Sequence, residues 1–127
     1  GVVLRDVQEY LKTFQKEMKW EISNSSYKDT RASILNNYML LTTEIGEVAE
    51  EFRAIFNETY KLINTDGMNE DQAFEIAKEM HKENIGKEIA DCLAYLMKFA
   101  NYLEIDLEES FYSKMNEIKS RVNKDQR

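Results

Sequence analysis

Residues 34–55, which read ILNNYMLLTTEIGEVAEEFRAI, decide the fold class of this 127-residue chain. Their apolar side chains recur at alternating steps of four and three residues, which is typical of a long helix packed along one seam. These apolar positions are Ile34, Tyr38, Leu41, Ile45, Val48, Phe52 and Ile55. Glu44, Glu47 and Glu51 flank the seam, so their charges point toward a groove between helices rather than into bulk water. The stretch therefore predicts a core helix with an acidic edge.

Helical periodicity continues through most of the remaining chain. We expect further helices at about residues 3–19, 70–82 and 85–103, and a last one from about 107 to 123. The polar run at 20–30 predicts a loop. Asn69 and Asp106, each followed three residues later by Gln or Glu, are capping-box signals for helix starts. The sequence leaves open whether Asn84 and Gly86 interrupt the helical stretch.

Composition also favours helices, because the chain has no proline and only four glycines. A chain of this length buries about two thirds of the surface that its unfolded form exposes, which is enough for a modest core. We therefore expect one all-α domain over residues 1–127, a bundle of four to five helices with a frayed tail at 123–127. Apolar residues exceed what one small core needs, which predicts a homodimer or homotetramer with a shared bundle core. The residues in excess include Tyr10, Phe14, Phe52 and Phe56.

The charge balance restricts the possible partners. The formal net charge is −7, from 24 acidic and 17 basic residues, whereas nucleic acid polymers and anionic membranes attract basic surfaces. No apolar run reaches the roughly 18 residues of a membrane span. Cys92 is the only cysteine, so no internal disulfide can form, and we expect a cytoplasmic protein. A small polyanion such as a nucleotide remains possible if metal ions mediate the contact.

Two acidic pairs carry the chemistry: Glu44 with Glu47, and Glu88 with Asp91. Each pair is spaced three residues apart, which puts both carboxylates on one helix face. If the two helices lie side by side, four carboxylates meet, and two unit charges 4 Å apart repel by about 4 kcal/mol at an effective dielectric near 20. A divalent cation removes this repulsion. Hard oxygen ligands suit Mg²⁺, with Mn²⁺ as a second possibility, and Mg²⁺ commonly bridges substrate phosphates.

Two simpler interpretations compete with this one. A single acidic pair on a helix is usually solvated surface, although two pairs that each flank an apolar seam weaken that interpretation. A di-iron carboxylate bundle is also helical and acidic, but it needs two Glu-x-x-His motifs. His81 is the only histidine and follows Lys78 by three residues, so we set the di-iron bundle aside and expect His81 on the surface.

The two pairs also carry a family resemblance. Residues 41–51, LTTEIGEVAEE, and 86–96, GKEIADCLAYL, resemble the MazG-type all-α nucleoside triphosphate pyrophosphohydrolases. Their signature is Glu-x-x-Glu followed by Glu-x-x-Asp on the next core helix, and the resemblance covers roughly residues 34–121. It implies Mg²⁺-dependent hydrolysis of an NTP or dNTP to the monophosphate and pyrophosphate, a possible role in nucleotide-pool house-cleaning. The positions that match the family's metal ligands are Glu44, Glu47, Glu88 and Asp91.

The resemblance suggests further roles. Lys114 and Arg121 match two positions that hold substrate phosphates in the family, while Ile118 stands where an Asn is expected. Lys98, two turns beyond Asp91, could also reach a phosphate, or it could be a plain surface lysine. The connection between the motifs is longer than in compact members, so residues 57–83 could form an inserted helix over the site or at a subunit contact.

Glu47 is our first choice to orient or deprotonate the attacking water, with Glu50 and Glu51 as alternatives. For stacking on the nucleobase we favour Trp20 and Tyr95, and core or rim packing is the competing role for both. Gly46 inside a helix has two explanations, a close approach by a neighbour or mere tolerance.

Alternative functions are a phosphoribosyl-ATP pyrophosphohydrolase, a deoxynucleotide-specific enzyme, and a non-catalytic helical binding module with an acidic groove. The sequence does not determine the base, the sugar or the pathway.

Overall fold

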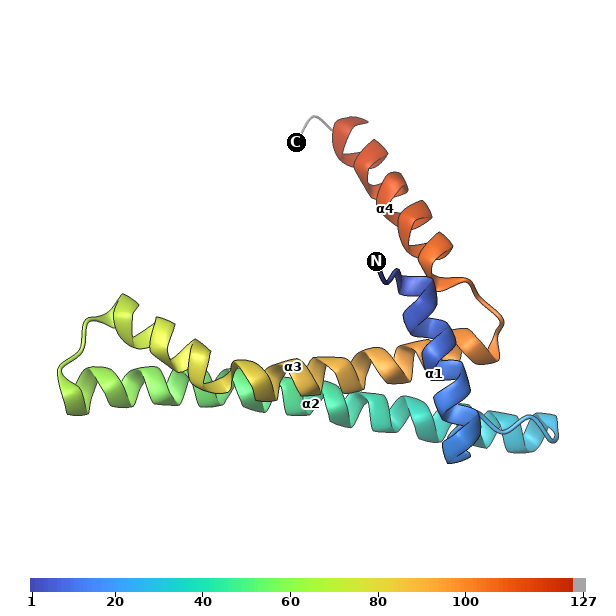
Figure 1. The fold of residues 1–127 in the computed structure, drawn as a ribbon, viewed down its shortest axis with the longest axis horizontal. Coiled ribbons are helices and arrows are strands. Elements are labelled where there is room, and N and C mark those ends of the chain that lie inside the picture. Colours follow the sequence, from blue (N-terminus) through green and yellow to red (C-terminus); the bar gives the residue numbers. More distant parts are fainter. Residues whose placement is uncertain (125–127) are drawn as a thin grey trace. The chain divides into compact units, whose positions relative to one another are not determined.

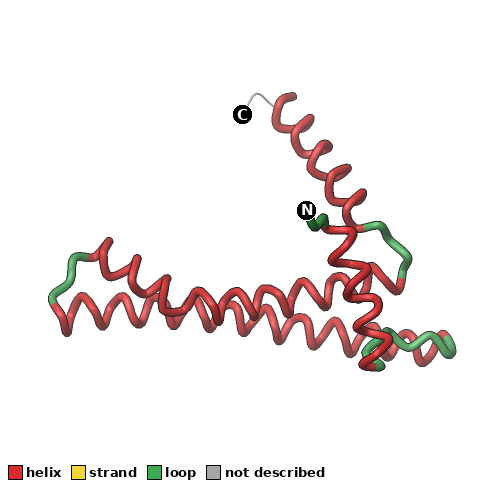
Figure 2. The backbone as a smooth tube through the Cα atoms, viewed as in Figure 1, coloured by secondary structure: helices red, strands yellow, loops and turns green. Residues whose placement is uncertain are grey.

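The computed structural model describes residues 1–124, and within these residues it contains four helices and no strand. This confirms the all-α prediction (Figures 1 and 2). The helices are α1 (Leu4–Met18), α2 (Tyr27–Asp66), α3 (Glu70–Tyr102) and α4 (Leu107–Lys124). Of the predicted frayed tail, Asn123 and Lys124 belong to α4, and residues 125–127 lie outside the described part.

The chain forms two compact units. Residues 35–95 make up one, which we call the hairpin unit because it contains the helical hairpin of α2 and α3. The terminal unit comprises residues 1–34 together with the chain from residue 96 onward. The prediction that residues 1–127 form one domain stays a prediction.

In the hairpin unit, α2 and α3 run side by side in opposite directions (Figure 1). Two contacts define their register: Glu44 of α2 lies near Glu88 of α3, and Glu51 of α2 lies near His81 of α3. Each step of seven residues forward along α2 is thus matched by seven residues backward along α3. Farther along, the rings of Phe56 and Phe74 stack with their centroids 6.5 Å apart. The buried residues of this unit include Leu41, Ile55, Ala73 and Ala77.

A short turn at residues 67–69 reverses the chain between α2 and α3. Gly67 has φ +64°, a left-handed conformation that glycine adopts without steric cost, and the N–H of Met68 donates to the Leu62 carbonyl. The Asn69 side chain then caps α3, because its Oδ1 accepts the N–H groups of Asp71 and Gln72 at 3.0 and 3.3 Å.

The structure decides the question that the sequence left open at Asn84 and Gly86. Both residues lie inside α3, which is continuous from Glu70 to Tyr102. One glycine in a helix interior costs only about 1 kcal/mol relative to alanine, less than a break would cost in lost backbone hydrogen bonds and packing along α2. Residues 57–83 are the last turns of α2, the turn and the first turns of α3, so this segment is not a separate helix. Its predicted role stays a prediction.

The predicted loop at 20–30 is too long, because α2 already begins at Tyr27. Ser26 provides the start signal that the apolar pattern missed. Its hydroxyl accepts the Asp29 N–H at 3.1 Å, and its carbonyl accepts the Thr30 N–H at 2.9 Å. This is a serine N-cap, and the acidic Asp29 in the first turn complements the positive end of the helix dipole.

In the terminal unit, α1 packs against α4. The Arg5 guanidinium donates to Asp106 at 2.8 Å and pairs with Glu108 at 3.1 Å. Asp106 also caps α4, as predicted, by accepting the Glu109 N–H at 3.2 Å. Among the described residues, no helix combines the length and the apolar content that crossing a membrane requires.

Candidate metal centre

Three of the predicted metal ligands lie together in the hairpin unit: Glu44 of α2, and Glu88 and Asp91 of α3. One carboxylate oxygen of each lies within 4.8 Å of the others. We call these three residues the carboxylate cluster. The three-residue spacing places Glu88 and Asp91 on one face of α3, and the antiparallel register brings Glu44 opposite them. Glu44 and Glu88 are half-buried, whereas Asp91 is exposed.

The cluster is electrostatically unfavourable without a cation. Burial raises the pKa of Glu44, and the charges of Asp91 and Glu88 raise it further. None of the described salt bridges of lysine or arginine includes a carboxylate of the cluster. A divalent cation would satisfy all three acceptors at once, and a purely oxygen donor set fits Mg²⁺ or Mn²⁺.

Tyr95 and Cys92, both on α3, lie beside the carboxylate cluster. Burial raises the pKa of the Tyr95 phenol, and the charges of Glu44 and Asp91 add to the effect, so this predicted base contact lies beside the cluster. Burial likewise raises the pKa of the Cys92 thiol, with Glu44 as the next contributor. Without a metal ion the thiol therefore stays protonated at neutral pH.

Glu47 does not join the cluster within the described structure. It is exposed, one turn after Glu44, and close enough that its charge contributes to the raised pKa of Glu44. Its predicted roles, as a fourth metal ligand and as the residue that activates water, stay predictions.

The predicted phosphate contacts on α4 are engaged with a neighbour that the sequence analysis missed. Lys114 and Arg121 both pair with Glu117, at 3.3 and 2.8 Å, and all three residues are exposed. A glutamate three residues after one cation and four before the other is a visible signal for such pairing. These residues belong to the terminal unit, and their predicted contact with phosphate stays a prediction.

Lys98, predicted to contact a phosphate, and Trp20, predicted to stack on the base, contact each other in the terminal unit. Lys98 is only 3% exposed, and its Nζ lies 4.1 Å from the centroid of the Trp20 ring, a cation–π contact. Burial lowers the pKa of Lys98 to about 8. The alternative of a plain surface lysine is therefore wrong.

His81 is not the surface residue that we expected. It is half-buried, its Nδ1 lies 3.7 Å from Glu51 Oε2, and its Nε2 is buried with no partner in the described structure. The sequence shows His81 on a predicted helix but not the antiparallel register that brings Glu51 opposite.

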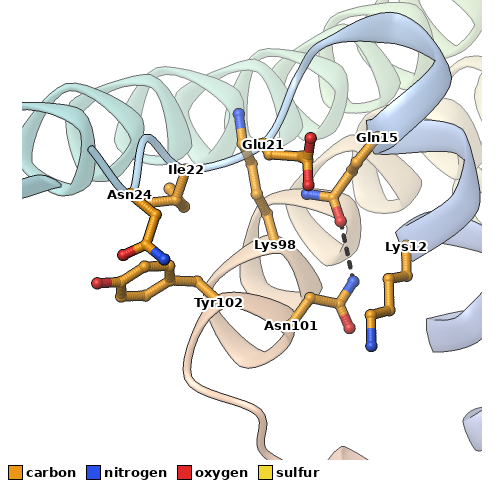
Figure 3. A pocket seen from close by; sticks show the side chains of 8 residues that line it. All are labelled: Lys12, Gln15, Glu21, Ile22, Asn24, Lys98, Asn101 and Tyr102. Carbon is orange, nitrogen blue, oxygen red and sulfur yellow. Dashed lines mark hydrogen bonds between the residues drawn. The ribbon is translucent and has the colours of Figure 1, made fainter.

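The terminal unit also contains a cavity of about 150 Å³ that the sequence did not indicate (Figure 3). It lies between α1, the loop after it and the last turns of α3. The residues that line it are Lys12, Gln15, Glu21, Ile22, Asn24, Lys98, Asn101 and Tyr102.

Comparison with known proteins assigns the family. A family model described as the MazG nucleotide pyrophosphohydrolase domain matches residues 32–124. The chain therefore belongs to the MazG nucleotide pyrophosphohydrolase family. The match includes the carboxylate cluster and Tyr95, whereas α1 and the loop that follows it lie outside. No curated protein and no solved structure matches the chain.

Proposed function

We propose that this protein hydrolyses a nucleoside triphosphate, either an NTP or a dNTP, to the monophosphate and pyrophosphate, with Mg²⁺ or alternatively Mn²⁺. The carboxylate cluster carries the proposal, because three carboxylates held together on two packed helices suit a cation that also binds phosphate. Membership of the MazG family supports the reaction class. Removal of non-standard or surplus nucleotides is the physiological role that we infer.

Glu44, Glu88 and Asp91 would hold the metal. When bound, Mg²⁺ neutralises charge on phosphate oxygens and lowers the pKa of a bound water. Two packed helices hold these three carboxylates close together before any ligand arrives, so little reorganisation is needed on binding. Glu47, exposed and one turn from Glu44, would orient the attacking water or accept its proton.

The test is pyrophosphate release from a panel of NTPs, dNTPs and phosphoribosyl-ATP, with Mg²⁺ or Mn²⁺. We expect turnover that falls by about 100-fold or more in Glu88→Gln and Asp91→Asn, because each change removes one anionic ligand. Glu83→Gln is the matched control, since Glu83 is an exposed acid of the same helix that pairs only weakly with Lys87, at 3.5 Å.

The outcomes separate the alternatives. A preference for dNTPs or for phosphoribosyl-ATP within the panel identifies the narrower enzyme. No turnover with any compound, together with no stabilisation by Mg²⁺, contradicts the proposal and favours a non-catalytic module with an acidic groove. Circular dichroism of each variant shows whether a loss of activity reflects unfolding.

We further propose that a second copy of the chain covers an apolar strip of the hairpin unit. A shallow groove there is lined by Ile45, Val48, Ala49, Phe52, Ile89 and Cys92. Ile45, Phe52 and Ile89 are each about half exposed, at 54, 47 and 51%. Contiguous exposed apolar surface of this kind commonly marks an interface. The residues that line the strip are themselves uncharged, so a second copy could cover them without burying a charge.

A further inference from the structure

A chain of three side-chain amides crosses the terminal unit and ends at the cavity. The backbone N–H of Leu107 donates to Gln8 Oε1 at 3.0 Å, and Gln8 Nε2 donates to the Ile105 carbonyl at 2.7 Å. Gln8 Nε2 also donates to Asn101 Oδ1 at 3.0 Å. Asn101 Nδ2 in turn donates to Gln15 Oε1 at 2.9 Å. Gln8 and Gln15 are both buried.

The two backbone groups determine which way every amide points. A backbone N–H can only donate and a carbonyl can only accept, so Gln8 must present Oε1 to Leu107 and Nε2 to Ile105. Gln8 Nε2 then requires an acceptor on Asn101, which leaves Nδ2 of Asn101 to donate to Gln15. Gln15 is therefore held with its oxygen on Asn101 and its Nε2 as a donor at the other end.

Gln15 Nε2 has no acceptor within the described structure, although Gln15 is only 3% exposed. Gln15 Nε2 is not sealed from solvent, because within the described structure only His81 Nε2 is both buried and without a partner, so the nitrogen can donate to water or to a ligand in the cavity. Gln15 lines the cavity, and in Figure 3 its amide nitrogen points away from Asn101, toward the side of the cavity where Glu21 and Lys98 lie.

Two further residues of the cavity wall, Glu21 and Tyr102, provide groups that a ligand could contact. Glu21 is exposed and places a carboxylate at the rim, which accepts hydrogen bonds, and Tyr102 contributes an aromatic ring. A water occupies about 30 Å³ of liquid, so the cavity of about 150 Å³ has room for a few waters or one small ring. A planar ring with an acceptor next to a donor matches Gln15 and Glu21 together, and an aromatic wall favours stacking.

We propose that this cavity binds a nucleobase, whose carbonyl oxygen or ring nitrogen accepts from Gln15 Nε2 and whose N–H group donates to the Glu21 carboxylate. The inference rests on the proposed function only for the choice of a nucleobase among planar rings of this size. It concerns the terminal unit alone and does not depend on the metal centre. Its central residues, Gln15 and Glu21, lie outside the matched residues 32–124.

The test titrates free nucleosides, which carry no phosphate, into the protein in EDTA. We expect the side-chain amide resonances of Gln15 to shift in NMR spectra, with saturation. Trp20 is the only tryptophan, and Lys98 both lines the cavity and contacts its ring, so tryptophan fluorescence is the second readout. Saturating shifts confined to other parts of the protein, or no shift with any nucleoside, overturn the inference and leave water as the partner of Gln15.

Two variants locate the binding. Glu21→Gln leaves the amide chain intact and replaces the acceptor at the rim, so we expect nucleoside binding to weaken by about tenfold. Glu17→Gln, an exposed acid of α1 that does not line the cavity, is its control. Gln15→Met removes the Nε2 donor together with the Oε1 that accepts from Asn101, and it is expected to weaken binding at least as much. Gln72→Met, at an exposed glutamine that does not line the cavity, is its control. Unchanged affinity in Glu21→Gln and in a folded Gln15→Met contradicts the assignment.

The inference and the proposed function fail separately. Metal-dependent triphosphate hydrolysis without nucleoside shifts at Gln15 overturns the nucleobase cavity and retains the enzyme. Nucleoside binding that depends on Gln15 and Glu21, in a protein that hydrolyses nothing, supports the cavity and overturns the enzyme.

Discussion

At the scale of single residues, the sequence was most informative for the carboxylates. Glu88 and Asp91 could be paired in advance because helix geometry puts residues three apart on one face. In the structure Glu44 lies close to both of them. Glu47 is likewise three residues from Glu44, but it is not among the carboxylates whose oxygens lie within 4.8 Å of one another. Spacing determines which side chains share a face, but the rotation of each helix against its neighbour determines which of them meet.

Binding of Mg²⁺ should stabilise the protein through the carboxylate cluster. A ligand at about 100 times its Kd adds about 2.7 kcal/mol to the free energy of unfolding. We expect Mg²⁺ to raise the Tm of the wild type and to leave the Tm of Glu44→Gln nearly unchanged. Differential scanning calorimetry with and without Mg²⁺ measures both. An equal rise in the two proteins would show that the ion binds elsewhere.

Lys98 should make stability depend on pH in the alkaline range. Its pKa is lowered by burial from 10.5 to about 8, so between these values the unfolded state binds more protons than the native state. The penalty for burying the charge is present below about pH 8 and disappears as the pH rises toward 10.5. We therefore expect the wild type to gain stability relative to Lys98→Met over that range.

Urea unfolding of both proteins at neutral pH and at about pH 9.5 measures this difference. Lys82→Met is the control, because Lys82 is 75% exposed and has only a weak contact with Glu79, at 3.9 Å. If the stability difference between the wild type and Lys98→Met is the same at both pH values, Lys98 is not buried as a charged group.

At the scale of helices, types and caps were predictable while some ends were not. Asn69 and Asp106 cap α3 and α4 as expected, because a cap depends on a local hydrogen bond that the sequence shows directly. The start of α2 was placed too late, since Ser26 precedes a stretch without apolar periodicity. The continuity of α3 through Gly86 depends on packing along α2, which periodicity alone does not reveal.

Gly46 and Gly86 form a matched pair for testing what the metal centre requires. Both lie inside helices, and a Cβ added at either would meet nothing within 4 Å in the described structure. This favours tolerance over close approach as the explanation for Gly46. Each Gly→Ala change should stabilise the protein by about 0.5–1 kcal/mol, which thermal unfolding would detect.

Their effects on activity should be equally small. Turnover that falls in Gly46→Ala but not in Gly86→Ala would show that a bound substrate or a second copy needs the space beside Gly46. In that case tolerance would be the wrong explanation.

At the scale of the whole molecule, the chain consists of two units that present different surfaces. The hairpin unit carries the carboxylate cluster and the apolar strip, whereas the terminal unit carries the amide chain and the cavity. Of the apolar residues that the sequence analysis named as exceeding one small core, Phe52 lines the strip. The sequence did not indicate the cavity, because Gln8, Gln15 and Asn101 are distant in sequence and resemble ordinary polar residues there.

The apolar strip predicts the assembly state. Phe52→Asp places a charge on the strip, where a second copy would have to bury it, so we expect the protein to shift from dimer or tetramer toward monomer. Analytical ultracentrifugation measures this shift. Tyr60→Asp is the control, because Tyr60 is 70% exposed on the same helix and does not line the groove. A wild type that is monomeric at all concentrations would end this proposal.

The sequence by itself determined the helical class, the caps of α3 and α4, and the family, because these depend on local hydrogen bonds, on periodicity along one helix and on short motifs. Only the tertiary structure decided which carboxylates meet, that His81 faces Glu51, and that three amides align to present Gln15 to a cavity. These results depend on the register between helices. That register is determined by packing between residues far apart in the sequence, which no local pattern records.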